Sequence, residues 1–297
     1  MVSLSLQSLN QYIFIINNRS GRNKNQELND RIQSAVKALQ LKAQVHSTQH
    51  ADETTSLVKQ GLKDGIRHFI AVGGDGTVNT LAKHLVHTDA VLGIIPRGSG
   101  NGLARHFNIT KDIQGALTRV LKNNIQTIDA IRINDQWSFN VAGIGFDGYI
   151  STRFGENGQR GLRNYMKLIN QEYKAYPPVE MHIIAKNINL QTSLFQLAIA
   201  NASQYGNNAI IAPLASLNDQ LLDIAMIRKV PLAILPAFLL RVFSGNIDRS
   251  KYFKSFKTEK LGIKTSRPVH FHTDGDGKGM SDSFEINVVP ECLKILI

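Results

Sequence analysis

Two glycine-rich segments, each directly after an apolar run, carry the residue types that could bind a chain of phosphates. The first is 73–77 (Gly-Gly-Asp-Gly-Thr) after the run 69–72, and the second begins at Gly98 after the run 91–95. Glycine lets backbone amides approach a ligand closely, and amides beside a helix N-terminus form a concave site for anions. The two segments therefore predict a clamp for a polyphosphate, and Asp75 suggests a metal ion or a reacting hydroxyl nearby.

These segments need strands and helices that hold them in place. In the first 125 residues apolar runs alternate with helical patterns, and strands are expected at 12–16, 43–46, 69–72 and 91–95. Such alternation with short loops predicts a doubly wound parallel sheet with helices on both faces. Ligands usually bind at the carboxyl ends of such strands, where both glycine-rich segments lie.

The pattern changes near Ile125, after which short β-like runs dominate. Helical candidates interrupt them at 162–173 and 232–243. This arrangement predicts a second, mainly antiparallel domain, a β-sandwich. The expected domains are 1–125, an α/β nucleotide-binding domain, and 126–285, the β-sandwich. A C-terminal strand at about 286–297 is expected to return to the first domain.

Composition limits the class of protein. The 297 residues, 42% of them apolar, can fill two cores, and a single cysteine, Cys292, excludes an internal disulfide. No signal-peptide pattern is present, and the apolar region 230–240 is too short to span a bilayer, so the expectation is a cytoplasmic protein. The formal charge of +11 indicates an anionic partner, although many proteins are simply basic.

Other motifs in the sequence give weaker indications of function. No P-loop signature occurs, which argues against an ordinary P-loop kinase. Gly143, Gly145 and Gly148 match the spacing of a dinucleotide fingerprint but are interpreted as a turn between strands. His270 and His272 share a strand face, but without an evident third ligand they do not predict a zinc site.

Taken together, the two glycine-rich segments resemble the diacylglycerol kinase catalytic-domain family, which includes sphingosine kinases and bacterial lipid kinases. The matching stretches are 73–79 (Gly-Gly-Asp-Gly-Thr-Val-Asn) and 96–105 (Pro-Arg-Gly-Ser-Gly-Asn-Gly-Leu-Ala-Arg). Further likeness lies at 16–21, 140–147, 218–223 and 274–276. The resemblance implies a Rossmann-like first domain related to NAD kinases and phosphofructokinases, a β-sandwich second domain, and ATP-dependent phosphorylation of a lipid hydroxyl.

The resemblance also assigns catalytic and nucleotide-binding roles. Asp75 is the first candidate and Asp276 the second for the base at the acceptor hydroxyl, and either acid could instead hold Mg²⁺ through water. The residues implied in ATP binding are Asn17, Ser20, Thr48, Gly73, Gly74, Gly76, Thr77, Gly98, Ser99, Gly100, Asn101, Arg160 and Arg163. For the two arginines, a solvated helix start is nearly as good an interpretation. An Asp75→Asn variant is expected to fold almost normally and to lose turnover by orders of magnitude.

Substrate and cation contacts are implied in the second domain. Asp147 and, less strongly, Asp129 would meet the lipid acceptor. The loop 216–221 would hold a structural cation through Asp219 and the backbone carbonyls of Ser216 and Leu221, with a plain hairpin turn as the equal alternative.

Departures from the family pattern keep two alternatives open. Thr80 replaces a common glutamate, Gly102 replaces an aspartate, and Asp276 is one methylene shorter than the usual glutamate. A non-catalytic protein that binds a nucleotide or lipid therefore stays open. A soluble-substrate kinase of the NAD kinase type, which shares Gly-Gly-Asp-Gly-Thr, stays open as well.

A basic segment, 249–260, bears on possible partners. Its lysines and arginine alternate with aromatic residues, so it could rest on anionic headgroups and give peripheral membrane association. An exposed strand with its aromatics packed inward is the favoured alternative. No RNA-binding signature appears, so a nucleic-acid partner is not expected. The sequence is compatible with a homodimer.

Overall fold

The structure, a computed structural model, describes residues 11–18, 25–156 and 161–297, and the chain divides into two compact units. The first unit contains residues 1–128 and 292–297, and the second contains residues 129–291. The division falls within strand β5 (Ile125–Ile133), whereas the sequence placed it at residue 125. The return to the first unit begins at Cys292 rather than at about residue 286.

The first unit is built on a parallel sheet with the strand order β4-β3-β1-β2. The last residues of β14 (Asp276–Leu296) extend this sheet, since Lys294 and Ile295 pair in parallel with Val91 and Leu92 of β4. Every residue of β3 and β4 is buried, which explains their continuous apolar sequences. The strands are β1 (Tyr12–Asn17), β2 (Ala43–Thr48), β3 (His68–Gly73) and β4 (Val91–Pro96).

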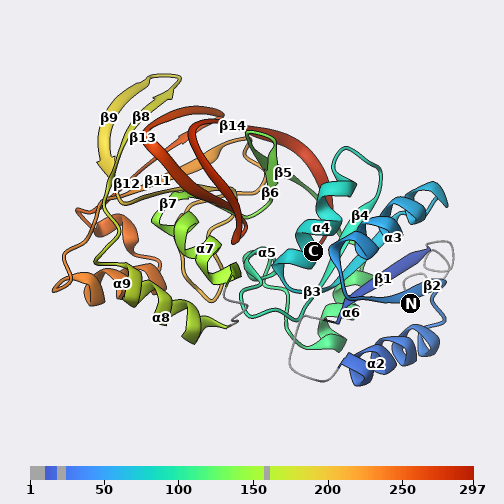
Figure 1. Cartoon of the computed structure of the whole chain (residues 1–297). Coiled ribbons are helices and arrows are strands. Elements are labelled where there is room, and N and C mark those ends of the chain that lie inside the picture. The colour runs from blue at the N-terminus through green and yellow to red at the C-terminus, as the bar shows by residue number, and fades with distance from the viewer. Residues whose placement is uncertain (1–10, 19–24, 157–160) are drawn as a thin grey trace. The chain divides into compact units, whose positions relative to one another are not determined.

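Helices cover both faces of this sheet. Helices α3 and α4 pack side by side on one face, and α2 and α6 lie on the other (Figure 1). The bounds are α2 (Asn25–Ala38), α3 (Ala51–Lys63), α4 (Asp75–Leu85), α5 (Gly102–His106) and α6 (Ile113–Leu121). This arrangement confirms the predicted α/β fold of the N-terminal domain.

The second unit is an antiparallel β-sandwich, as predicted. One run of neighbouring strands follows the order β12-β11-β10-β7-β13-β14, while β8 pairs with β13 and β9. The remaining strands are β6 (Gln136–Ser138), β7 (Val141–Gly145), β8 (Val179–Ala185), β9 (Ile188–Leu194), β10 (Gln196–Ala200), β11 (Leu222–Ile227), β12 (Phe253–Thr258) and β13 (Lys260–Thr273).

Three α-helices and a short 3₁₀ helix accompany the described strands of this unit. They are α7 (Phe146–Glu156), α8 (Leu162–Glu172), α9 (Leu235–Phe243) and the 3₁₀ helix η1 (Ile247–Arg249). Strand β7 runs directly into α7, so the expectation of a turn between strands at Gly143–Gly148 is wrong. No helix of the described ranges is long and apolar enough to cross a membrane.

Candidate functional site

The two glycine-rich segments lie at the same edge of the parallel sheet. Strand β3 ends at Gly73 and β4 ends at Pro96, and these two residues are partners in the register. The Arg97 amide donates a hydrogen bond of 2.7 Å to the Gly73 carbonyl and extends the pairing beyond the strands. The turns that follow are therefore held beside each other, as the sequence predicted for the ends of parallel strands.

The two turns meet backbone to backbone. A Cβ added to Gly98 would lie 2.6 Å from the Gly74 Cα, and a Cβ added to Gly74 would lie 3.1 Å from the Gly98 Cα. A Cβ on Gly73 would overlap the Thr77 side chain. A side chain at Gly98, and to a lesser degree at Gly74, would push the two turns apart, whereas a side chain at Gly73 would displace Thr77 within the first turn. Gly76 differs, because a Cβ there would point into open space.

Asp75, the first residue of α4, ties the first turn to the second. Its Oδ2 accepts the Asn101 N–H at 2.8 Å, and its Oδ1 accepts the Gly102 N–H at 2.7 Å. Such hydrogen bonds to an ionised carboxylate are about twice as strong as neutral ones. Asp75 therefore acts at least as a positioning residue that fixes the start of α5, a role that sequence reasoning missed.

Asn101 closes the second turn on itself. Its backbone is left-handed with φ of +53°, and its side-chain amide binds Gly98 twice. The Gly98 N–H donates to Asn101 Oδ1 at 2.9 Å, and Asn101 Nδ2 donates to the Gly98 carbonyl at 2.8 Å. The Arg105 Nε donates to the Gly100 carbonyl at 2.9 Å. Side chains thus fix the shape of this turn from within.

The strand ends of β1 and β2 complete this edge. Asn17 and Thr48, the last residues of the two strands, are partners in the register. The Asn17 amide donates to the Thr77 hydroxyl at 3.0 Å, and the buried Thr48 hydroxyl lies 3.0 Å from that of Thr54. The predicted nucleotide residues of the first unit therefore gather along one sheet edge, except Ser20, which lies outside the described residues. Their role in binding ATP stays a prediction.

Asp276 lies in the second unit, next to a tight turn. Thr273 and Asp276 pair across the two-residue turn of Asp274 and Gly275, whose φ angles are +51° and +87°. Positive φ at both positions is the geometry of a type I′ hairpin turn, for which Asp-Gly is a preferred sequence. The Asp276 side chain is 59% exposed, with Lys278 Nζ at 3.9 Å. Its catalytic role stays a prediction.

The neighbouring Asp274 holds the loop before β7. Its carboxylate accepts the Ser138 hydroxyl at 2.6 Å and the backbone amides of Phe139, Asn140 and Val141 at 2.8 to 3.0 Å. The conformation of the hairpin beside Asp276 therefore depends on Asp274. Of the two predicted arginines, Arg163 is exposed on α8 and Arg160 lies outside the described residues.

Asp129 is fully buried in the second unit. Its Oδ2 accepts the Gln220 N–H at 2.7 Å and its Oδ1 accepts the Glu291 N–H at 2.8 Å. The Asp129 amide in turn donates to the Leu217 carbonyl at 2.6 Å. These bonds give Asp129 a structural role, and the predicted substrate contact would have to compete with two amides.

The predicted cation loop contains an internal cation. The Lys257 ammonium lies 2.7 Å from Asp219 Oδ2 and 3.2 Å from Asp223 Oδ2, and it donates to the Leu214 carbonyl at 3.2 Å. Burial alone would lower the pKa of Lys257, but the two carboxylates outweigh it and raise that pKa. Burial also raises the pKa of the Asp223 carboxyl, against the opposing effect of Lys257.

This lysine leaves a poor fit for a structural metal. The Asp219 carboxylate is neutralised by Lys257, and its Oδ1 accepts the Leu221 N–H at 3.2 Å. The Ser216 hydroxyl donates to Asn218 at 2.9 Å. In the described part of the chain, no group of three or more His, Cys, Asp or Glu side chains is placed to hold a metal. The Lys257 ammonium therefore takes the place that a structural cation would occupy in this loop.

A buried polar cluster surrounds Asp147 at the start of α7. Its Oδ2 accepts the Tyr205 hydroxyl at 2.6 Å and lies 3.4 Å from His272 Nε2, and its Oδ1 accepts the Gly148 N–H at 2.9 Å. The His272 Nδ1 accepts the Gly275 N–H at 3.2 Å, so the proton of a neutral ring is on Nε2 and faces Asp147. Burial, followed by the charge of Asp147, raises the pKa of Tyr205.

This cluster depends on Gly143. A Cβ at that position would overlap the Asp147 carboxylate and lie 2.5 Å from His272 Nε2. The glycines of the apparent dinucleotide fingerprint therefore serve close packing at a strand-to-helix junction. Sequence reasoning singled out Asp147 but missed its partners Tyr205 and His272, which lie far away in the chain. The predicted contact of Asp147 with the acceptor stays a prediction.

A cavity of about 280 Å³ lies elsewhere in the second unit. The Tyr149 hydroxyl at its wall donates to Glu172 at 2.9 Å, and the Arg267 guanidinium stands 5.7 Å from the centre of the Tyr176 ring. Burial raises the pKa of Tyr176 to about 12. The cavity thus combines aromatic walls with one cation, and its lining residues are Tyr149, Glu172, Ala175, Tyr176, Pro177, Arg267, Val269, His270 and Met280.

Comparison with known families agrees with this geometry. The family model of the diacylglycerol kinase catalytic domain matches residues 11–133, and that of the YegS C-terminal NAD kinase beta sandwich-like domain matches residues 140–297. The chain belongs to the diacylglycerol kinase family. It is therefore a member of a lipid-kinase family, as the two glycine-rich segments indicated.

Curated relatives match this family member over most of its length. A diacylglycerol kinase of Mycobacterium tuberculosis is 27% identical over 254 residues, which cover 83% of this chain and 82% of the relative. A Salmonella arizonae protein named "Probable lipid kinase YegS" is 27% identical over 289 residues, with 95% and 94% coverage.

Solved structures share the fold. A diacylglycerol kinase of Bacillus anthracis superposes with a TM-score of 0.75 at 18% identity and covers 96% of each chain. An NAD kinase of Archaeoglobus fulgidus in complex with ATP gives a TM-score of 0.57 at 12% identity, with 97% of this chain and 93% of that chain covered. At these identities the likeness concerns the fold alone.

Proposed function

We propose that this protein transfers the γ-phosphate of ATP to the hydroxyl of a lipid. The observation that carries the proposal is the backbone contact between Gly74 and Gly98, fixed by the two hydrogen bonds of Asp75. This contact joins the two turns into one compact, glycine-rich backbone surface at the ends of β3 and β4. Such a surface suits a chain of phosphates, since backbone amides stabilise anions without a bulky side chain in the way.

In the proposed reaction the acceptor oxygen forms a bond to the γ-phosphorus, and the bond from that phosphorus to the bridging oxygen of ADP breaks. The hydroxyl proton passes to a carboxylate, with Asp75 and Asp276 as the candidates. Phosphoryl transfer depends mainly on positioning and on neutralising charge. Charge on the transferred group would be neutralised by Mg²⁺ bound to the phosphates of the nucleotide.

The acceptor class rests on family membership rather than on a pocket. The candidates are diacylglycerol, a sphingoid base, phosphatidylglycerol and an undecaprenol-like alcohol. Incubation of the protein with ATP labelled in the γ-phosphate, Mg²⁺ and each detergent-dispersed lipid should give a labelled lipid in at least one case. NAD, assayed in parallel, tests the NAD kinase alternative.

The outcomes separate the three hypotheses. A labelled lipid with unlabelled NAD supports the proposal. Labelled NADP without labelled lipid would replace it with a soluble-substrate kinase. ATP binding without any labelled acceptor would instead favour a non-catalytic binding protein, for which Thr80, Gly102 and Asp276 are the motivating departures from the family pattern.

A further inference from the structure

The hairpin turn that precedes Asp276 is held at both of its residues. Asp274 accepts hydrogen bonds from the hydroxyl and amides of residues 138–141. The amide of Gly275, the second residue of the turn, donates to His272 Nδ1 at 3.2 Å. Two separate sets of hydrogen bonds therefore fix the conformation of this turn.

The buried His272 ring extends over Gly143 toward helix α7. His272 and Gly143 are partners in the antiparallel register of β13 and β7, and a Cβ at Gly143 would lie 2.5 Å from His272 Nε2. Because the glycine has no side chain, the ring reaches Asp147 at the start of α7, with 3.4 Å between His272 Nε2 and Asp147 Oδ2. One imidazole therefore connects the hairpin turn to α7.

Asp147 is held from its other side as well. The Tyr205 hydroxyl donates to Asp147 Oδ2 at 2.6 Å, and the Gly148 amide donates to Oδ1 at 2.9 Å. Burial, followed by the negative charge of Asp147, raises the pKa of Tyr205, so its hydroxyl keeps the proton that it donates. A continuous chain of contacts thus runs from Gly275 through His272 and Asp147 to Tyr205, and we call it the hairpin network.

The hydrogen bonds of Asp274 lead back to the same loop as Tyr205. The Asn140 amide donates to Asp274 at 2.8 Å, and Asn140 Nδ2 donates to the Gln204 carbonyl at 2.9 Å. Gln204 directly precedes Tyr205 in the chain. The two sets of contacts therefore close into a circuit that restrains the turn from both sides.

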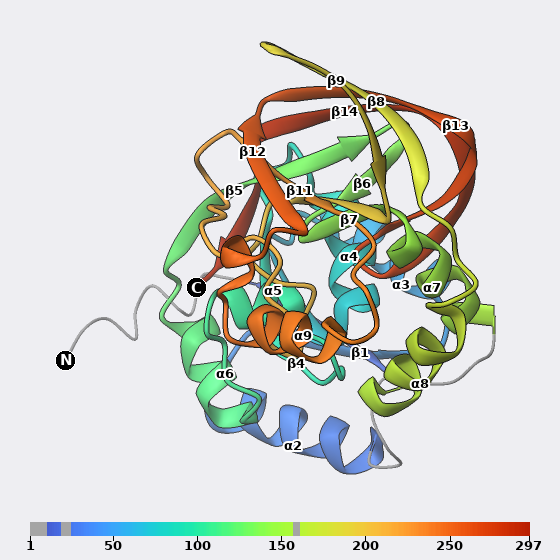
Figure 2. The same cartoon turned by 90° about the vertical axis from the view of Figure 1, so that its left-hand side faces the viewer.

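Close backbone packing holds α7 against both strands of the hairpin. Helix α7 lies against β13 (Figures 1 and 2). A Cβ at Gly148 would overlap the His270 carbonyl oxygen of β13, and a Cβ at Gly277 of β14 would lie 2.5 Å from Thr152 Oγ1 of α7. Asp147 and the hairpin are therefore parts of one tightly packed body.

We propose that His272 is a positioning residue for the Asp276 carboxylate. Its ring, held by Asp147, fixes the Gly275 amide and with it the turn that places Asp276 at the start of β14. The Asp276 side chain is 59% exposed and lies 3.9 Å from Lys278 Nζ, so its own contacts hold it weakly and its position depends on the turn. The inference rests on the proposed function, in which Asp276 is one of the two candidate carboxylates.

Steady-state turnover tests this role, with labelled ATP and the lipid of the panel above that accepts label. His272→Phe keeps a ring and removes both nitrogens, so kcat should fall about 10- to 100-fold, as expected when a catalytic group is misplaced. The KM for ATP should stay near the wild-type value, because most of the predicted nucleotide contacts lie in the first unit. His272→Asn offers an acceptor near the position of Nδ1 and should retain more turnover than His272→Gln.

A double-variant cycle separates positioning from a general loss of structure. If His272 acts through Asp276, adding His272→Phe to Asp276→Asn should lower kcat by less than about twofold further. The control is His182→Phe on β8, which loses a hydrogen bond of 2.7 Å to Asn189 outside the hairpin network and should leave kcat unchanged. Losses that multiply in the double variant would overturn the proposal, and so would a wild-type kcat in His272→Phe.

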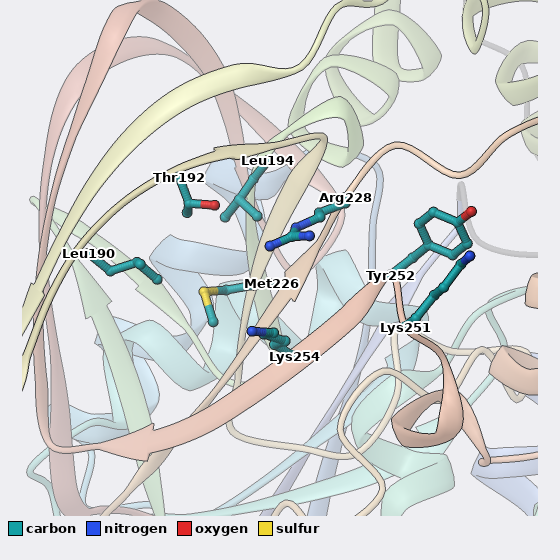
Figure 3. Close-up of a pocket in the computed structure, with 8 residues that line it drawn as sticks. All are labelled: Leu190, Thr192, Leu194, Met226, Arg228, Lys251, Tyr252 and Lys254. Atoms are coloured by element: carbon teal, nitrogen blue, oxygen red, sulfur yellow. The ribbon is translucent and has the colours of Figure 1, made fainter.

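Tyr205→Phe tests the far end of the hairpin network. It removes the hydroxyl that binds Asp147 and should lower kcat about fivefold. Tyr252→Phe is the matched control, because its ring borders a small cavity of about 60 Å³ whose lining shares no residue with the hairpin network (Figure 3). Equal kcat values in the two variants would contradict the proposed network.

Nitrogen NMR of the histidine rings tests the geometry without turnover. At a pH of about 8, where histidine rings are ordinarily neutral, His272 should carry its proton on Nε2, since Nδ1 accepts the Gly275 amide. A proton on Nδ1 would overturn the proposal even in an active enzyme. The expected Nε2 proton in a protein that labels no lipid would instead leave the hairpin network standing and remove the proposed function.

Discussion

Asp75→Asn should destabilise the first unit, because both carboxylate oxygens of Asp75 are already used by backbone amides. The Asn101 and Gly102 N–H groups donate to them at 2.8 and 2.7 Å. An asparagine of the same shape keeps one acceptor oxygen and places an NH₂ group against the other amide. One hydrogen bond to a charged group is lost, which costs about 1.5 to 3 kcal/mol of unfolding free energy.

This loss corresponds to a decrease of roughly 3 to 12 °C in the melting temperature of the first unit. Differential scanning calorimetry or thermal unfolding followed by circular dichroism would measure it. The structure thus revises the sequence-based expectation that Asp75→Asn folds almost normally. The expected loss of turnover by orders of magnitude remains, because a displaced second turn would also misplace the phosphates.

Asp52→Asn provides the matched control. Asp52 is an exposed acid in the first turn of α3, just as Asp75 begins α4. Its removal should cost only the interaction with the helix dipole, about 0.3 to 1 kcal/mol. If Asp75→Asn proved as stable as Asp52→Asn, the positioning role derived from the two amide bonds would be wrong.

Two further perturbations concern titratable side chains, one beside two carboxylates in the second unit and one in the core of the first unit. Lys257→Met should lower the free energy of unfolding by about 1 to 2 kcal/mol, because Asp219 and Asp223 lose their cation; the loss is smaller than for a fully buried pair because Lys257 is a third exposed. In calorimetry, millimolar Ca²⁺ should restore part of the lost stability. An unchanged melting temperature in Lys257→Met would contradict this account. Burial lowers the pKa of His68, whose buried Nδ1 has no hydrogen-bond partner while Nε2 faces Asn123 at 3.0 Å. The neutral ring therefore contributes stability above the unfolded pKa of about 6.5, which is lost as the pH falls through and below that value. Between pH 7.5 and pH 5 the melting temperature of His68→Phe should therefore decrease less than that of the wild type. An equal decrease in both proteins would refute the assignment of His68 as a neutral buried ring.

The first domain could be predicted well from the sequence because its signals are local. Its strands are continuous apolar runs, and four of them were placed within one or two residues of β1 to β4. Helix α6 is also visible in the sequence, since its apolar residues 113, 116, 117, 120 and 121 recur on one helical face. Both glycine-rich segments could be placed at strand ends for the same reason.

The helices and strands of the second domain were harder to predict from the sequence. Helix α7 was missed because its buried residues, among them Phe146, Gly148 and Ile150, do not lie on one helical face. The sequence therefore shows no clear stripe of apolar residues at helical spacing. Strand β9 alternates between half-buried and exposed side chains and therefore shows no apolar run in the sequence. In the sequence, strand β13 shows only two short apolar runs, 261–263 and 269–271, because polar and exposed residues separate them.

The contacts that define the site could not be predicted, because they join distant residues. Asp75 binds amides more than twenty-five positions away, and Asp147 meets His272 only through the packing of α7 against β13. Lys257 lies opposite Asp223 because β11 and β12 pair in one particular register. Such registers depend on the whole sheet, whereas residue types and their spacing give information only about structure that is local in the sequence.

ATP binding to Gly76→Ala, measured by isothermal titration calorimetry beside the wild type, tests the central claim most directly. A Cβ at Gly76 meets no protein atom within 4 Å, so the variant should fold with equal or slightly higher stability, as should the control Gly155→Ala in α7. If the phosphates lie against the first turn, the methyl group should weaken ATP binding in Gly76→Ala and leave it unchanged in Gly155→Ala. Equal ATP affinity in both variants and the wild type would contradict the account.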